Sequence, residues 1–343
     1  MDTRYSPEQL DLRAAAASLL ADLGPRTVAD LDDAGRRARL AEAGHAAGWF
    51  DLRGPGVDDA SLASGVEVAI VAREMGRVAA DTPYLGPTIA VDLARHAGLV
   101  LDDPHTSVVF EPTLWDVARV TSDSSEGIAV DCAGARRGFV LIADDRGTMR
   151  LSEVPLGADA PASDLTRSLA SATVTAGSAN ATIGAAFTTA AVMRTRALAL
   201  AITVADLVGI MEGALDVTCA YARERKQYGV AIGSFQAVQH LLAEARVLVE
   251  GAISVAQYAA WAVDALAPED AWDAGAVAKA YCAGAARTVC ETAIQVHGGI
   301  GNTWECFVHV YLRRALLSSA LLGDEGYHLR ALARRRLGAD VGL

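Results

Sequence analysis

One run of polar side chains, from Arg223 to Gly229, is the strongest candidate for binding a charged ligand. It reads Arg-Glu-Arg-Lys-Gln-Tyr-Gly. Arg225 keeps its charge and can bond two phosphate oxygens at once, which suits a pyrophosphate. Gln227 adds directed hydrogen bonds, and Tyr228 offers a flat surface for stacking. The alternative interpretation is that these basic residues only complement the dipole at the end of a helix.

A second candidate group surrounds a glycine turn further along the chain. Gln295 is followed by the run His297-Gly298-Gly299-Ile300-Gly301. Consecutive glycines allow positive φ and let a ligand approach the main chain closely. Taken alone, such a turn is weak evidence for a site, because glycine also commonly ends helices.

Asp206 is the candidate for a proton-accepting group. It interrupts an apolar run from Ala197 to Ile210. A carboxylate in an apolar groove has a raised pKa and is a better general base near neutral pH. The alternative is that Asp206 is satisfied by a nearby arginine, such as Arg194 or Arg196, or by solvent.

Helices must position these three candidates. The chain has 343 residues, which is enough for two or three packed subdomains. Helical periodicity over residues 187–343 predicts four long helices joined by short loops, which form an antiparallel four-helix bundle. The predicted spans are 187–224, 234–265, 271–297 and 303–319.

The regions before the bundle differ in character. Residues 1–104 predict a helical domain that begins with Ser6 as N-cap and Pro7 at the first helical position. Residues 105–186 hold short β-type runs between turn residues and predict a small antiparallel β domain. The predicted fold class is therefore mainly α with a small β domain. The order of a helical domain, a β domain and a helix bundle argues against Rossmann and barrel folds, which alternate strands with helices.

Composition argues against several other functions. The net charge of -12 argues against nucleic-acid binding, which needs a basic surface. The histidines form no HxxxH or HExxH pair, so no metal site is expected. The cysteines form no CxxC pair, and the N-terminus is polar, which indicate a cytoplasmic protein with reduced thiols. Apolar runs such as Ala197 to Ala205 fall far short of the ~20 residues of a membrane span.

The order and spacing of the two ligand-binding candidates resemble the C-terminal signature of the acyl-CoA dehydrogenase family. Arg-x-Gln-Tyr-Gly stands at Arg225–Gly229, and Ile-Gly-x-Phe-Gln-x-Val-Gln at Ile232–Gln239. Gln-x-x-Gly-Gly-x-Gly follows at Gln295–Gly301. The resemblance is close over residues 187–330, weaker in the N-terminal helices and weakest in the β domain. By these motifs the chain resembles the short, actinobacterial-type members.

The resemblance implies the same three-part fold, with FAD bound at a subunit interface. It implies the α,β-dehydrogenation of an acyl-CoA thioester, in which a carboxylate takes the α proton and flavin N5 receives the β hydride. An electron-transfer flavoprotein would accept the electrons, and the protein would be a homo- or hetero-oligomer, either a dimer or a tetramer. The residues that would contact the FAD of a neighbouring subunit are Arg225, Gln227, Tyr228, Phe235, Gln236, Gln295, Gly298 and Gly299.

The sequence departs from the family pattern at the catalytic base. Many members carry a Glu where this chain has Leu322, and a second group carries one where it has Ala199. Neither side chain accepts a proton. Asp206 lies seven residues after Ala199, on nearly the same helix face, and is the remaining candidate.

The β domain also departs from the pattern. Phe110–Thr113 keeps only a remnant of the turn that holds the flavin ring. Two assemblies therefore stay open. One is a homomeric enzyme that uses Asp206 as base. The other is an α2β2 assembly in which this chain has lost its own flavin pocket but completes that of its partner.

Overall fold

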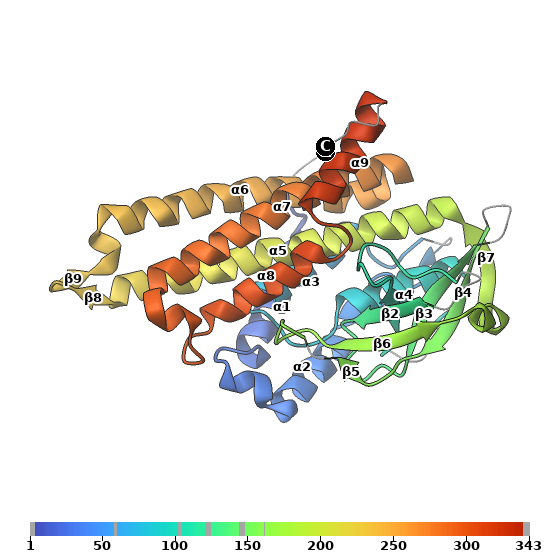
Figure 1. The fold of residues 1–343 in the computed structure, drawn as a ribbon, viewed down its shortest axis with the longest axis horizontal. Coiled ribbons are helices and arrows are strands. Elements are labelled where there is room, and N and C mark those ends of the chain that lie inside the picture. Colours follow the sequence, from blue (N-terminus) through green and yellow to red (C-terminus); the bar gives the residue numbers. More distant parts are fainter. Residues whose placement is uncertain are drawn as a thin grey trace.

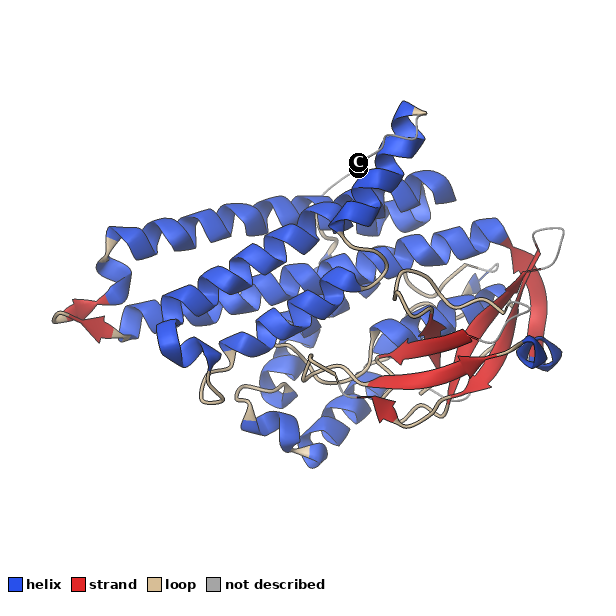
Figure 2. Cartoon of the chain, in the orientation of Figure 1, coloured by secondary structure: helices blue, strands red, loops and turns tan. Residues whose placement is uncertain are grey.

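The computed structural model describes residues 4–57, 60–101, 105–120, 125–143, 148–160 and 162–338. Long helices run side by side over most of the molecule, and a sheet covers one end (Figures 1 and 2). Helices precede and follow the strands in the chain. The predicted fold class, mainly α with a small β domain, is confirmed.

The described N-terminal region contains four α-helices, of which the first three begin with a side-chain cap and the fourth does not. Ser6 caps the first helix in a capping box with Gln9, and Pro7 follows, as predicted. Ser64 caps the third in the same way. The elements are α1 (Pro7–Leu23), η1 (Ala29–Asp32), α2 (Ala34–Ala46), η2 (Trp49–Asp51), α3 (Gly65–Arg77) and α4 (Leu85–His96).

The β domain is a seven-stranded sheet in the order β5-β6-β2-β1-β3-β4-β7. The expectation of a purely antiparallel sheet was wrong, because β1 and β3 pair in parallel. β2 pairs with the other edge of β1, so the chain crosses before β3 begins. The strands are β1 (Ser107–Phe110), β2 (Ser125–Val130), β3 (Arg137–Ala143), β4 (Thr148–Pro155), β5 (Asp159–Ala160), β6 (Leu169–Val174) and β7 (Thr182–Thr188), with η4 (Ala176–Ala181) between the last two.

The C-terminal region holds the predicted long helices. Its elements are α5 (Thr189–Glu224), β8 (Lys226–Gln227), β9 (Val230–Ala231), η5 (Ile232–Ser234), α6 (Gln236–Ala265), α7 (Pro268–His297), η6 (Gly298–Asn302), α8 (Val308–Ala320) and α9 (Glu325–Leu337). The predicted boundary after residue 104 touches residues outside the described ranges. The predicted boundary after residue 186 falls within β7.

The central element of the fold is α5, which is buried along most of its length. By length and composition alone it would pass for a membrane span, contrary to the expectation that no apolar run is long enough. Its apolar stretch is wholly buried within the protein, so its composition is that of a core helix. It packs against the N-terminal helices and the rest of the bundle, and therefore joins the two helical regions.

The approach of α3 to α5 depends on glycines. A Cβ at Gly209 would lie 2.0 Å from the carbonyl oxygen of Arg73, and one at Gly76 would lie 2.3 Å from that of Asp206. Since no real side chain tolerates such contacts, the two backbones meet only because Cβ atoms are absent. This close packing holds Asp206 at a fixed depth in the core.

Candidate functional site

The Arg225 cluster lies at the end of the bundle where α5 meets α6. Strands β8 and β9 form a hairpin that projects from this end (Figure 1). Tyr228 and Gly229 occupy its turn with positive φ angles of 52° and 83°. Tyr228 is 95% exposed. The hairpin therefore presents its side chains outward rather than to the chain's own core.

The glycine turn lies at the same end of the bundle. Tyr221, one turn before Arg225, stacks on His297 with ring centroids 4.3 Å apart and an interplanar angle of 18°. This contact joins the ends of α5 and α7. A Cβ at Gly298 or Gly299 would meet nothing within 4 Å. The structure thus brings the two sequence motifs together beside an open stretch of main chain.

The residues predicted to contact FAD share one property, which is exposure to solvent at this end of the bundle. They are Arg225, Gln227, Tyr228, Phe235, Gln236, Gln295, Gly298 and Gly299. In the described ranges, the guanidinium of Arg225 forms no ion pair. Phe235 is the N-cap residue of α6 and supplies no side-chain cap, so its side chain leaves the first N–H groups of this long helix without a partner.

This set of groups fits the adenosine diphosphate half of FAD. A free guanidinium and an uncapped helix N-terminus favour a pyrophosphate. Aromatic rings of Tyr228 and Phe235, with centroids 6.3 Å apart, offer stacking surfaces, and amides offer directed bonds. Among the described residues, the guanidinium of Arg225 and the side-chain amides of Gln227 and Gln295 make no hydrogen bond that would compete with such a ligand.

The base position of the family falls on Leu322, which is 5% exposed and apolar. Its N–H donates to the carbonyl oxygen of Leu114 at 2.7 Å. The same loop, 111–116, is held by a tilted ring contact between Trp115 and Tyr327, with centroids 4.9 Å apart, and by the Arg196–Asp116 ion pair. A cavity of only about 190 Å³ remains beside Leu322. Leu322 cannot accept a proton through its side chain. The loop 111–116 contacts it directly through Leu114.

The segment carrying Leu322 is fixed by a buried lysine that the sequence reading missed. Lys279 Nζ donates to the carbonyl oxygens of Ser319 and Gly323, both at 2.8 Å. A ring nitrogen of His328 lies 2.9 Å from the carbonyl oxygen of Leu322. Burial lowers the pKa of Lys279 to about 7. Burial and the neighbouring Lys279 lower the pKa of His328 to about 4.

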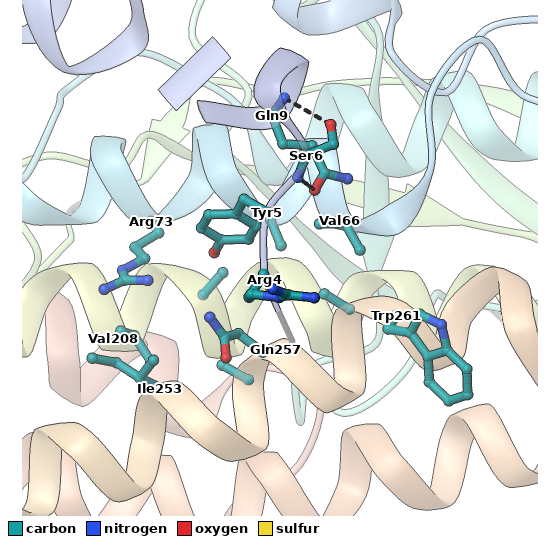
Figure 3. A pocket seen from close by; sticks show the side chains of 14 residues that line it. Arg4, Tyr5, Ser6, Gln9, Val66, Arg73, Val208, Ile253, Gln257 and Trp261 are labelled. Carbon is teal, nitrogen blue, oxygen red and sulfur yellow. Dashed lines mark hydrogen bonds between the residues drawn. The ribbon is translucent and has the colours of Figure 1, made fainter. Parts of the chain in front are cut away.

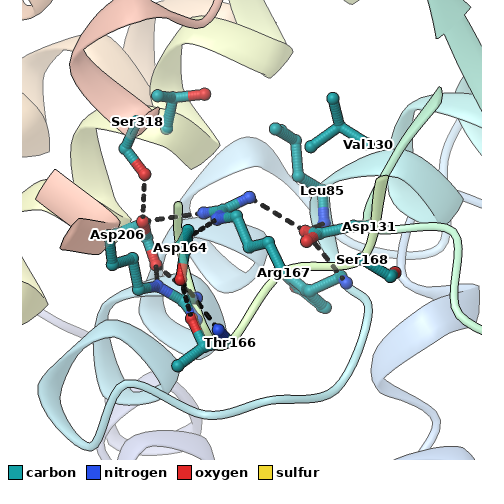
Figure 4. Close-up of polar contacts among 12 residues, drawn as sticks. Leu85, Val130, Asp131, Asp164, Thr166, Arg167, Ser168, Asp206 and Ser318 are labelled. Atoms are coloured by element: carbon teal, nitrogen blue, oxygen red, sulfur yellow. Dashed lines mark hydrogen bonds and ion pairs between the residues drawn. The ribbon is translucent and has the colours of Figure 1, made fainter. Parts of the chain in front are cut away.

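Asp206 lies in a buried ion-pair network rather than in an apolar groove (Figure 4). It is 2% exposed. Its Oδ1 accepts from Nε and Nη2 of Arg314 at 3.0 and 2.7 Å. Its Oδ2 accepts from Arg167 Nη2 at 2.8 Å and from Ser318 Oγ at 2.9 Å. Both oxygens are therefore occupied.

The expectation of a raised pKa at Asp206 was wrong. Burial acts to raise it, but the charges of Arg314 and Arg167 and the hydrogen bonds to this carboxylate hold the pKa of Asp206 below its usual value. The expected partners were also wrong. Arg194 bonds to the carbonyl oxygens of Val263 and Leu266, and Arg196 pairs with Asp116. We infer that Asp206 is a structural carboxylate, because a base needs a free oxygen that faces substrate.

The network extends beyond Asp206 and joins distant segments. Arg167 also pairs with Asp131 at 3.0 Å, which in turn accepts from the N–H of Leu85 at 3.0 Å. Arg314 also donates to the carbonyl oxygen of Ala80 at 2.6 Å. Through these contacts the β domain, the α3–α4 connection, α5 and α8 are held together by one set of charges.

A larger cavity, of about 550 Å³, lies between the N-terminal segment, α3, α5 and α6 (Figure 3). Apolar side chains line much of it, and Arg4, Tyr5, Gln9 and Gln257 line it as well. No carboxylate is among the described residues that line it, and the guanidinium of Arg73 is bound to Glu212 through two hydrogen bonds. None of the predicted site residues lines it, so it adds nothing to the candidate redox site.

Comparison with known proteins agrees with the motifs. The family model for the C-terminal domain of acyl-CoA dehydrogenases matches residues 184–337. IpdE2, an acyl-CoA dehydrogenase of Mycolicibacterium smegmatis, is 31% identical over 277 residues, which cover 78% of this chain and 77% of that protein. FadE34, an acyl-CoA dehydrogenase of Mycobacterium tuberculosis, is 40% identical over 155 residues, but these cover only 22% of its length.

Solved structures share the whole fold. A chain of the Tcur3481-Tcur3483 steroid acyl-CoA dehydrogenase superimposes with a TM-score of 0.78 at 21% identity, over 95% of this chain and 96% of that one. A chain of the ChsE4-ChsE5 complex of Mycobacterium tuberculosis gives 0.77 at 22% identity, over 99% and 100%. At these identities the likeness concerns the fold.

This chain belongs to the acyl-CoA dehydrogenase family, as the match to IpdE2 over most of both chains shows. The predictions of the family, of FAD as cofactor and of acyl-CoA dehydrogenation as the activity are thereby confirmed. The assignment of individual site residues stays a prediction, supported where the geometry fits and weakened at Asp206.

Replacing Asp206 by Ala should destabilise the fold strongly. The change leaves the buried guanidiniums of Arg167 and Arg314 without their shared partner, which costs about 3–5 kcal/mol in the free energy of unfolding. Asp216→Ala on the same helix is the matched control. Its partner Arg77 is solvent-exposed, so the loss there should be under about 1 kcal/mol. Urea denaturation measures both, and equal losses would refute the structural role.

Lys279 makes the stability depend on pH in a defined direction. Between about pH 7 and the ordinary lysine pKa of ~10.4, the unfolded chain binds this proton and the folded chain does not. The free energy of unfolding should therefore rise with pH, by up to about 1.4 kcal/mol per pH unit from this group. Below pH 7, Lys279 is protonated in both the folded and the unfolded chain, so this group no longer makes the free energy of unfolding depend on pH.

Lys279→Met isolates this contribution. The variant leaves the carbonyl oxygens of Ser319 and Gly323 unpaired, which lowers stability by an amount that does not change with pH. The free energy of unfolding of wild type minus that of the variant should grow from pH 7 to pH 10. Parallel profiles over this range would show that Lys279 is not desolvated.

Proposed function

We propose that this chain contributes the end of its bundle to an FAD-dependent acyl-CoA dehydrogenase site that it shares with another subunit. The observation that carries the proposal is the exposed surface formed by the hairpin and the glycine turn. Arg225 and the glycine turn are exposed there, and Arg225 has no ion-pair partner in the described part of the chain. A monomer gains nothing from such a surface, whereas a cofactor held between subunits uses it.

In this proposal, Arg225 and the N-terminus of α6 bind the pyrophosphate of FAD that is seated mainly in the neighbouring chain. Gln227 and Gln295 orient the cofactor through hydrogen bonds, and Tyr228 and Phe235 cover it from water. FAD supplies the redox chemistry when bound, by accepting a hydride from the β carbon of the acyl thioester. The residues of this chain bind and orient it without taking part in proton transfer.

We further propose that the catalytic base comes from the other subunit. The two positions at which the family resemblance places a base carry Leu322 and Ala199 here. Leu322 is covered by the loop 111–116 through its bond to Leu114. Asp206 has both oxygens bonded to Arg167, Arg314 and Ser318. Among the two assemblies, these features favour the hetero-oligomer over a homomeric enzyme with Asp206 as base.

The partners follow from the same proposal. One solved structure of this fold is titled as a complex of two different chains, ChsE4 and ChsE5, and another as an electron transferring flavoprotein of Acidaminococcus fermentans. We propose that this chain likewise works in an oligomer, and that its electrons pass to an electron-transfer flavoprotein. The acyl-CoA substrate would bind beside the flavin ring in the neighbouring chain.

Replacing Arg225 by Ala should lower the FAD affinity of the assembly. A charge-assisted hydrogen bond contributes about 1.5–3 kcal/mol, so the dissociation constant should rise roughly 10- to 100-fold. The measurement is a flavin titration of the complex isolated through a tag on this chain. Arg246→Ala is the control, because Arg246 is an exposed arginine of α6 paired only with Glu250. An unchanged flavin affinity in the Arg225 variant would refute the pyrophosphate role.

A further inference from the structure

The cavity of about 550 Å³ beside α3 has no part in the proposed function. It shares no lining residue with the cavity beside Leu322, and none of the residues assigned to FAD lines it. Helices α3, α5 and α6 form its walls, and the segment Arg4–Ser6, ahead of α1, runs across the space between α3 and α6 (Figure 3). We call this space the N-terminal cavity.

Close backbone contacts fix the walls of the N-terminal cavity. α3 meets α6 where a Cβ at Gly65 would lie 2.7 Å from the carbonyl oxygen of Ala260, and it meets α5 at Gly76 and Gly209. Because the backbones already touch at these glycines, the helices cannot move closer to fill the space. The apolar side chains between the contacts are mostly too short to fill it: Ala69, Ala205, Val208, Ile253, Ala256 and Ala260. The cavity is therefore formed before any ligand binds.

The polar groups of the N-terminal cavity are mainly hydrogen-bond donors. Arg4 brings a cation, Tyr5 a hydroxyl and Gln257 an amide, and Figure 3 shows all three directed toward the middle of the cavity. No carboxylate is among the described residues that line it. A cavity with apolar walls and a few directed polar groups is typical of small-molecule sites. The excess of donors favours a ligand whose polar end accepts hydrogen bonds.

Two of these donors are available to a ligand. The amide of Gln257 makes no hydrogen bond to another side chain or main-chain group in the described part of the chain. The hydroxyl of Tyr5 interacts with the guanidinium of Arg73, which is itself bound to Glu212. Since a guanidinium only donates, the phenolic proton of Tyr5 remains free to be donated into the cavity.

We propose that the N-terminal cavity binds an amphipathic carboxylate, that is, a hydrocarbon chain that ends in a carboxyl group. An ionised carboxylate only accepts hydrogen bonds, and charge strengthens the bonds that it accepts. It accepts from the hydroxyl of Tyr5 and the amide of Gln257, beside the charge of Arg4. The hydrocarbon chain lies along the alanine-rich walls of α3, α5 and α6.

The lining of the N-terminal cavity disfavours other ligands. An organic cation would meet the guanidinium of Arg4 and no compensating carboxylate among the described lining residues. A metal ion is disfavoured because no group of three or more His, Cys, Asp and Glu side chains lies together in the described ranges. A small inorganic anion would leave the apolar walls uncovered, and a neutral alcohol would forgo the charge-assisted bonds.

The first measurement is the affinity of the purified chain for decanoate, by calorimetry at about pH 8, where the carboxyl group is ionised. Decanoate is used below the concentration at which it forms micelles. Decanol should bind at least about tenfold more weakly, since it lacks the charge, and decyltrimethylammonium should not bind. Octanoate should bind roughly tenfold more weakly, because each buried methylene contributes about fourfold. Absence of decanoate binding, or equal binding of decanol, would overturn the proposal.

Two variants test the polar end of the site. Tyr5→Phe and Gln257→Leu each remove one donor and should weaken decanoate binding at least about tenfold. Tyr258→Phe and Gln239→Leu are the matched controls, because they make the same changes on α6 at residues that do not line the cavity. The controls should bind decanoate as the wild type does. Unchanged affinity in both test variants would show that the carboxylate does not lie between these groups.

A third variant tests the apolar part of the site. Ala256→Phe places a ring in the cavity and should abolish decanoate binding. Decanoate should raise the melting temperature of the wild type, because it binds only the folded chain, and should not raise that of the variant. Intact decanoate binding in a folded Ala256→Phe variant would contradict the location. If the added ring prevents folding, Gln257→Leu, which keeps the size of the side chain, still tests the site.

The inference does not rest on the proposed function, since it concerns a cavity of the single chain. FAD and coenzyme A should therefore not displace decanoate, and displacement by either would overturn the separate site. Arg225→Ala should leave the affinity for decanoate unchanged, and Gln257→Leu should leave the flavin affinity of the complex unchanged. Failure of the shared FAD site and failure of the N-terminal cavity are thus observed in different variants.

Discussion

The ion pairs that Asp206 makes with Arg167 and Arg314 are the interaction on which the arrangement of this protein depends. Each residue comes from a different segment: the core helix α5, the β5–β6 connection and α8. Charges at this depth are tolerated only when each is paired and hydrogen-bonded. Their network therefore fixes the β domain against the bundle. It also commits the carboxylate of Asp206, on the buried face of α5, to structure.

Because Asp206 is bound in this network, the two ends of α8 differ in the groups that they offer for catalysis or binding. At one end, Leu322 stands at the base position under the loop 111–116, held by Lys279 and His328. At the other end, the hairpin and the glycine turn leave cofactor-type groups exposed. A chain that keeps the second surface while lacking the first is suited to completing a site in another subunit.

The sequence predicted the fold class, because helical periodicity and family motifs are local signals. Ser6 and Pro7 marked a helix start correctly, and the glycine turn stood where α7 ends. The role of Asp206 was not predictable, since its partners Arg167 and Arg314 are 39 and 108 residues away. Arg167 lies in the weakly matching β domain. Lys279 and Arg314 likewise bond to groups that are distant in the chain.

The measurement that tests the central claim most directly is the flavin content of the chain purified alone, read from its visible spectrum and quantified after denaturation. The account predicts little FAD and no turnover of acyl-CoA thioesters. It also predicts that FAD and activity appear when the chain is isolated together with a partner subunit. Stoichiometric FAD in the isolated chain, with reduction by an acyl-CoA, would contradict the account and restore a homomeric enzyme.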